Sequence, residues 1–82
     1  MRVVGYIESN FVPRNSEEEI KGYSVYLTLP IDQAGGKGMM TDKIYLSQRR
    51  LAADGLDINT LLGKDIQVIY NKMGKIAKIA EN

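Results

Sequence analysis

Alternating apolar and polar residues predict three β-strands in the first half of the chain. They span Arg2–Glu8, Tyr23–Leu29 and Thr41–Ser47. In the second strand, Ser24, Tyr26 and Thr28 share the polar face, opposite four apolar or aromatic side chains. This pattern is typical of a strand with one buried and one exposed face.

The first strand follows the same rule with a smaller apolar face. Strict alternation places Val3, Gly5 and Ile7 on the buried side, and it places Tyr6 on the exposed side. In the third strand Ile44 falls on the buried side. We therefore expect these three strands to pack one apolar face against a common core.

A short helix and a final hairpin are predicted in the second half. Helix-forming residues fill Gln48–Asp54, between Ser47 as the N-cap and Gly55 as the C-terminal stop. Asp57–Gly63 has the residues of one further helical turn. The strands of the hairpin are predicted at Asp65–Tyr70 and Lys75–Ala80, around a turn at Asn71–Gly74.

Two connections between the first three strands lack any apolar period. Asn10–Gly22 contains Pro13 and three consecutive glutamates, and it reads as a long loop. Gln33–Gly38 is rich in glycine and reads as the tip of a β-hairpin.

The order of these elements predicts one particular small architecture. The 82 residues are enough for a single domain, residues 1–82, and for one core. Three strands, a short helix and two more strands follow one another as in the five-stranded Greek-key barrel called the OB-fold. We therefore predict an all-β OB-fold barrel with one short helix; an open SH3-like or α+β sheet is the alternative.

The composition excludes much of enzyme chemistry. The chain has no Cys and no His, so it has no thiol nucleophile, imidazole base, disulfide or Cys/His zinc site. The glycines do not have the spacing of a phosphate-binding loop, and the run Glu17–Glu19 lies in a loop without paired strand-borne carboxylates. We expect no catalysis, no metal and no cofactor.

The N-terminal residues do not resemble a signal peptide, and no stretch is long and apolar enough for a membrane span. We therefore expect a cytoplasmic protein that does not bind membranes.

Three tyrosines are predicted on exposed strand faces. Tyr6, Tyr26 and Tyr45 belong to the first, second and third strands, whereas Tyr23 and Tyr70 fall on inward faces and are expected in the core. Exposed aromatic rings on strands two and three of an OB-fold stack on nucleic-acid bases. The alternative is that these rings cover a hydrophobic edge or a dimer interface.

Positive charge gathers in the same part of the chain, although the net charge is only +1. Residues 21–50 carry five basic residues against two acidic ones, while residues 1–20 carry an acidic excess. The basic residues that we expect to contact phosphates are Lys21, Lys37, Lys43 and Arg49. Lys37 lies at the glycine-rich tip, which is either a wing over a bound strand or only a connector.

These features together resemble the small single-stranded-DNA-binding proteins of phages and mobile elements, in particular the OB-fold type of filamentous phages. The resemblance is carried by Lys21–Leu27 before a glycine-bearing hairpin, by the strand with Tyr45, and by Gly63–Val68 at the start of the last hairpin. It implies a homodimer that coats displaced DNA strands during replication or transfer, without catalysis.

The sequence therefore predicts a sequence-tolerant binder of single-stranded nucleic acid, with DNA as the first expectation. A small β-barrel that binds a protein partner through the same tyrosines is the competing hypothesis, because tyrosine is enriched in protein interfaces.

Overall fold

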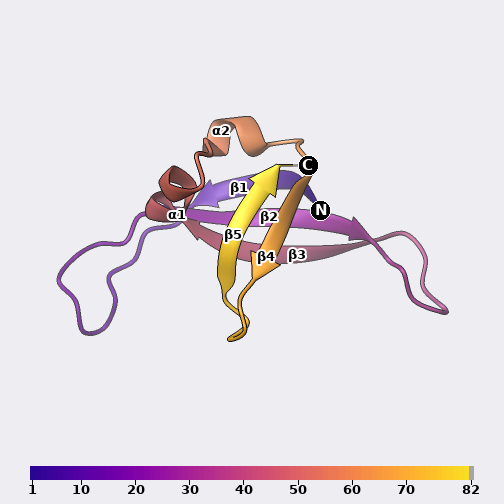
Figure 1. Cartoon of the computed structure of the whole chain (residues 1–82), viewed down its shortest axis with the longest axis horizontal. Coiled ribbons are helices and arrows are strands. Elements are labelled where there is room, and N and C mark those ends of the chain that lie inside the picture. Colours follow the sequence, from indigo (N-terminus) through magenta and orange to yellow (C-terminus); the bar gives the residue numbers. More distant parts are fainter. Residues whose placement is uncertain (82) are drawn as a thin grey trace.

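The computed structural model describes residues 1–81, which form five β-strands and two short helices (Figure 1). The strands are β1 (Arg2–Glu8), β2 (Gly22–Pro30), β3 (Met39–Ser47), β4 (Ile66–Tyr70) and β5 (Ile76–Glu81), and the helices are α1 (Gln48–Ala53) and α2 (Ile58–Leu61). The mostly-β class and the order of the strands are confirmed. The further helical turn expected within Asp57–Gly63 is confirmed as α2, where Asp57 is the N-cap and accepts a hydrogen bond from the Asn59 N–H at 2.9 Å, so the fold has two short helices and not the one named in the predicted architecture.

The first three strands form one antiparallel sheet in the order β1-β2-β3. The buried side chains on its inner face are Val3, Val25, Leu27, Ile44 and Leu46. On the outer face Tyr26 lies opposite Lys43, and Ser24 lies opposite Tyr45. The alternation in β2 and β3 thus has the predicted phase.

In β1 the alternation does not have the predicted phase. The pairing of β1 with β2 shifts between Val3 and Gly5, and such a bulge reverses the faces of the residues that follow it. Ile7 is 59% exposed, and Tyr6 packs against the core. The prediction of Ile7 inside and Tyr6 outside is therefore wrong, because strict alternation does not continue through a bulge.

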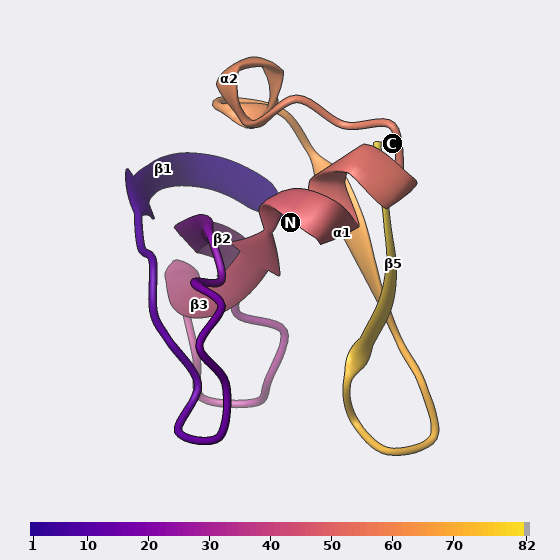
Figure 2. The same ribbon diagram turned by 90° about the vertical axis from the view of Figure 1, so that its left-hand side faces the viewer.

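The second sheet consists of β4 and β5 alone. Val68 of β4 lies opposite Ile79 of β5, and both are buried in the same core as the first sheet. The helices add Leu51, Ile58 and Leu61 to this core. The base of the hairpin is thereby packed against the rest of the molecule, while its turn projects away from it (Figure 2).

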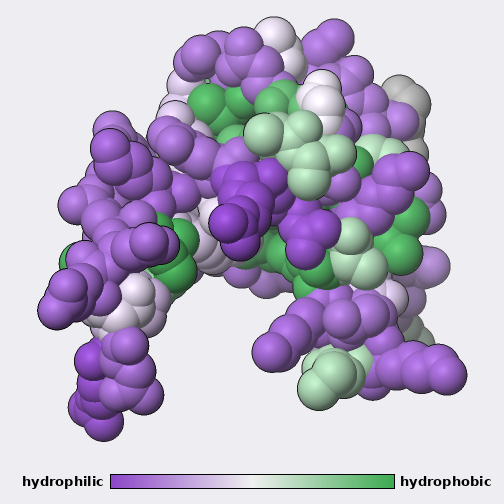
Figure 3. Space-filling model, turned by 60° about the vertical axis from the view of Figure 1, so that its left-hand side comes forward, coloured by the Kyte–Doolittle hydropathy of each residue, from purple (hydrophilic) through white to green (hydrophobic). Residues whose placement is uncertain are grey.

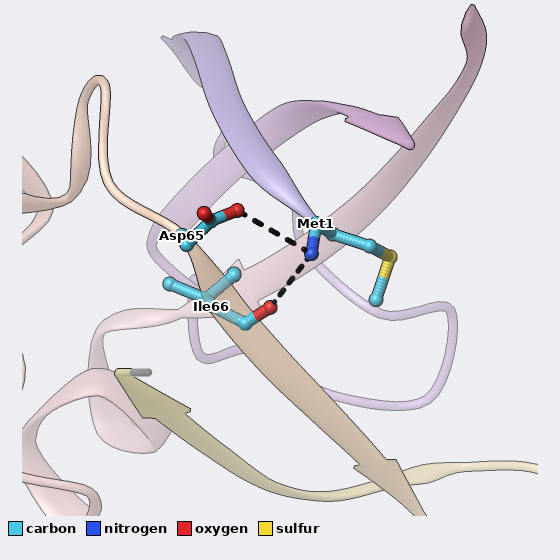
Figure 4. A network of polar contacts seen from close by, with 3 residues as sticks. All are labelled: Met1, Asp65 and Ile66. Atoms are coloured by element: carbon cyan, nitrogen blue, oxygen red, sulfur yellow. Dashed lines mark hydrogen bonds and ion pairs between the residues drawn. The ribbon is translucent and has the colours of Figure 1, made fainter. Parts of the chain in front are cut away.

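The two sheets are joined along β1. The Val3 N–H donates to the Lys64 carbonyl at 2.9 Å, and the Ile66 N–H donates to the Met1 carbonyl at 2.7 Å. The Met1 amino group donates to the Ile66 carbonyl at 3.1 Å and lies 3.7 Å from the Asp65 carboxylate (Figure 4). These contacts tie the start of β1 to the start of β4.

The opposite seam of the predicted barrel is open, because β3 and β5 do not pair within residues 1–81. Side chains of α1 and its C-cap bind β5 instead. The Arg50 guanidinium donates to the carbonyls of Ile76 and Ala77 at 3.0 and 2.7 Å, and the Ile79 N–H donates to the Asp54 carboxylate at 3.0 Å. The described chain therefore forms two antiparallel sheets that meet at one seam, rather than a closed barrel.

Candidate functional site

A groove of about 1240 Å³ occupies the open seam. One wall is the loop between β1 and β2, the floor includes the edge of β3 and the first turn of α1, and the other wall is the β4–β5 hairpin. Figure 2 shows the hairpin standing apart from the three-stranded sheet, and Figure 3 shows the hollow between the two projecting arms of the molecule. The groove therefore brings together segments from both ends of the chain.

The loop wall is held at its base by a short continuation of the β1–β2 ladder. The Phe11 N–H donates to the Ile20 carbonyl at 2.9 Å, and the Ile20 N–H donates back to Phe11 at 2.7 Å. Below this pair the Gly22 N–H donates to the Asn10 side chain at 3.2 Å. Phe11 is therefore fixed by backbone hydrogen bonds although it lies in a loop.

Tyr45 connects β3 to the same loop. Its hydroxyl donates to the Ser9 carbonyl at 3.0 Å, and its ring meets the Phe11 ring edge to face, with centroids 5.4 Å apart. Partial burial raises the pKa of the Tyr45 hydroxyl above its usual value of 10.0, so the hydroxyl remains a donor at neutral pH. Gly22 leaves room for it, since a Cβ there would lie 2.5 Å from the Tyr45 hydroxyl oxygen.

The charges of the groove favour an anionic ligand. Five basic residues line it against three acidic ones. The basic residues are Lys21, Lys43, Arg49, Arg50 and Lys75, and the acidic ones are Glu18, Glu19 and Asp42. In the part of the chain that the structure describes, the one ion pair within 4 Å joins Met1 to Asp65, so no carboxylate is in direct contact with these cations. Arg50 is committed to the β5 carbonyls, which leaves four basic side chains for a ligand.

Four of the residues predicted from the sequence lie together in this groove: Lys21, Lys43, Tyr45 and Arg49. Tyr45 is not the open platform that the alternation suggested, because Phe11 and the loop partly cover it.

The other three predicted residues lie elsewhere. Tyr6 faces the core, meets Tyr23 edge to face at 5.6 Å, and donates its hydroxyl to the Asn59 side chain at 3.0 Å. Tyr26 is 42% exposed on the outer face of the sheet without lining the groove, and Lys37 lies in the β2–β3 connection. The predicted residues therefore divide between the groove, the core, the outer sheet face and the β2–β3 connection.

Sequence reasoning missed two aromatic rings that line the groove, Phe11 and Tyr70. Phe11 falls in a segment without periodicity, so no pattern marked it. Tyr70 was expected in the core, and this is wrong: it lies on the inner face of the hairpin, opposite Ile76, but is 49% exposed. Alternation gives the face of a strand residue and does not show where the strand extends beyond the core.

No group of three or more Asp or Glu side chains within residues 1–81 is placed to hold a metal ion. In the same range no helix is long and apolar enough to cross a membrane.

Comparison of the chain with protein-family models, curated proteins and solved structures found no match.

Proposed function

We propose that this chain is a non-catalytic, sequence-tolerant binder of single-stranded nucleic acid, with DNA as its first ligand, and that the ligand lies in the groove. The observation that carries the proposal is the convergence of Lys21, Lys43, Arg49 and Lys75 on a groove that also contains aromatic rings. Basic side chains along a groove follow the phosphate backbone, and rings in it stack on bases of any identity.

The layout of the groove supports this proposal. In OB-folds, which are partly open five-stranded barrels, oligonucleotides bind across strands two and three and between the β1–β2 and β4–β5 loops. The groove here lies beside β3 and between the same two connections. The bridge between Arg2 and Asp65 also pairs β1 with the segment that leads into β4. We therefore propose that the two sheets are an OB-like barrel with its β3–β5 seam open.

A protein-binding module is the second candidate, and the open seam is the observation that favours it. Strand β3 has a neighbouring strand on one side only within residues 1–81, and an unpaired strand edge can accept an extended peptide, whereas Arg50 and Asp54 bind backbone groups of β5. The resemblance drawn from the sequence further suggests a homodimer, which light scattering of the purified chain tests directly.

A titration separates the two candidates. Fluorescence anisotropy of labelled oligo-dT, oligo-U and a duplex is measured at two salt concentrations. We expect oligo-dT to bind, the duplex to bind much more weakly, and the affinity to fall with a log–log salt slope of up to about −3, from four phosphate contacts at about −0.7 each. Absence of oligo-dT binding at low salt would overturn the nucleic-acid proposal and leave the protein-binding one.

A further inference from the structure

We infer that the bases of the bound strand stack on Phe11 and Tyr70, one from each wall of the groove, and that Tyr45 is a positioning residue that holds Phe11 in place. This inference rests on the proposed function and names the part of the ligand that each ring contacts.

Phe11 has the properties of a preformed stacking surface. Its ring lines the groove and is 46% exposed, which is unusual for the most apolar of the aromatic side chains. The backbone N–H and carbonyl of Phe11 are both hydrogen-bonded to Ile20, which fixes the residue. Its edge-to-face contact with Tyr45 occupies at most one face of the ring, so the other remains available to a base.

Tyr70 offers a second ring from the opposite wall. It is the last residue of β4, lies on the inner side of the hairpin opposite Ile76, and is 49% exposed. A large aromatic side chain on the inner face of a hairpin is ordinarily buried, and here that face looks into the groove. The position therefore suits contact with a ligand better than contact with the core.

Tyr45 acts on the ligand through Phe11. Its hydroxyl is used by the Ser9 carbonyl, and its ring is partly covered by Phe11. Tyr45 therefore presents less free surface than Phe11, while it anchors the segment from which Phe11 projects. Both walls then contribute one ring each, and basic side chains lie between and beside them along the same groove.

The absence of tryptophan makes these contacts directly observable. We place a single Trp by the substitutions Phe11→Trp and Tyr70→Trp. Tyr26→Trp is the control, because Tyr26 lies opposite Lys43 on the outer sheet face but does not itself line the groove. Stacked bases quench indole fluorescence, so oligo-dT is expected to quench the first two proteins strongly and the control weakly. Quenching of the Tyr26→Trp protein alone would overturn the inference, because it would place the bases on the outer sheet face.

Leucine variants measure the effect of each ring on affinity. Phe11→Leu and Tyr70→Leu keep apolar volume but remove the π face, and we expect each to weaken oligo-dT binding about 5- to 100-fold without changing the salt slope. Tyr26→Leu is expected to change the affinity for oligo-dT less than about threefold. If the unmodified chain binds oligo-dT and neither groove variant weakens binding, the inference fails while the proposed function stands; if the unmodified chain does not bind, the proposed function itself fails.

A double-mutant cycle tests the positioning role of Tyr45. Tyr45→Phe removes only the hydroxyl bond to Ser9, and we expect it to weaken oligo-dT binding by about 2- to 10-fold. In the Phe11→Leu background the same change is expected to have no further effect, because the ring that it positions is gone. Equal effects in both backgrounds would contradict the positioning role.

Discussion

The two walls of the groove are built very differently. The loop wall is an extension of a three-stranded sheet, and its base is tied by the backbone pair of Phe11 and Ile20 and by the Tyr45 hydroxyl. The hairpin wall is a two-stranded sheet, and an isolated two-stranded hairpin is at best marginally stable in water. Its attachment comes from its buried base, from the backbone hydrogen bonds between β1 and the start of β4, and from the side chains of Arg50 and Asp54 that bind β5.

This difference shows how a small domain can form a groove without a closed barrel. One wall is held at its base by the Phe11–Ile20 backbone pair that continues the β1–β2 ladder, and in the other Arg50 and Asp54 take the place of the missing β3–β5 hydrogen bonds. A ligand that contacts both walls would hold the hairpin to the sheet. The predictions below weaken one wall at a time.

The largest effect is expected from Arg50→Ala. The change removes two charge-assisted hydrogen bonds to β5, and we expect the free energy of unfolding to fall by about 2 to 3 kcal/mol. Amide exchange should accelerate more in β5 than in β2, because the hairpin loses its clamp. Arg49→Ala is the matched control on the same helix, and an equal loss of stability in both variants would contradict the special role of Arg50.

Gly22→Ala is expected to disturb the loop wall. An added Cβ would lie 2.5 Å from the Tyr45 hydroxyl oxygen and 2.6 Å from the Leu46 carbonyl oxygen, and the latter belongs to a paired strand that cannot easily shift. We expect the free energy of unfolding, measured by thermal or denaturant unfolding, to fall by about 1 to 3 kcal/mol. Gly5→Ala is the control, because a Cβ there meets nothing within 4 Å; a similar loss at both sites would refute the steric explanation.

Tyr45→Phe is expected to cost about 1 kcal/mol of unfolding free energy, through loss of the hydroxyl bond to Ser9. The partial burial of the same hydroxyl predicts a pH dependence. Since burial raises the folded-state pKa of Tyr45, its contribution is complete below the unfolded pKa of about 10 and is lost as the pH rises through the higher folded value. The stability difference between the parent and Tyr45→Phe should therefore shrink above about pH 10, and a difference that stays constant there would contradict the raised pKa.

The smallest effect is expected from neutralising the acidic run of the loop wall. Glu18 and Glu19 line the groove, and like charge repels an anionic strand. Replacing Glu17, Glu18 and Glu19 together by Gln should strengthen oligo-dT binding about two- to fivefold at low salt, with little change at high salt. Unchanged affinity at both salt concentrations would mean that the acidic run does not influence the site.

The sequence predicted the strands well where the alternation is regular. In β2 and β3 apolar and polar side chains occupy the expected faces, and Ser47 caps α1 as its position suggested. The bulge in β1 could not be recognised from the alternation of apolar and polar residues, so Tyr6 was assigned to the wrong face.

The open seam could not be read from the sequence, because it depends on long-range pairing that alternation does not encode. The same dependence on long-range contacts explains which residues of the groove could be predicted from the sequence. Lys21, Lys43, Tyr45 and Arg49, which line the groove, could be proposed from the sequence because they lie on or beside regular elements, within 30 residues of one another. Phe11 and Tyr70 come from either side of that segment and meet it only in the folded chain. Charge and aromatic content could therefore be predicted, whereas the groove that combines them could not.

The central claim is that a single nucleic-acid strand lies between the two walls, and NMR mapping of the backbone amides tests it most directly. On titration with oligo-dT we expect the largest shift changes in three segments from different parts of the chain, at residues 11–21, 42–50 and 70–76. The amides of α2 and of the β2–β3 connection should change little. Shift changes confined to those other regions, or to β2 around Tyr26, would contradict the account.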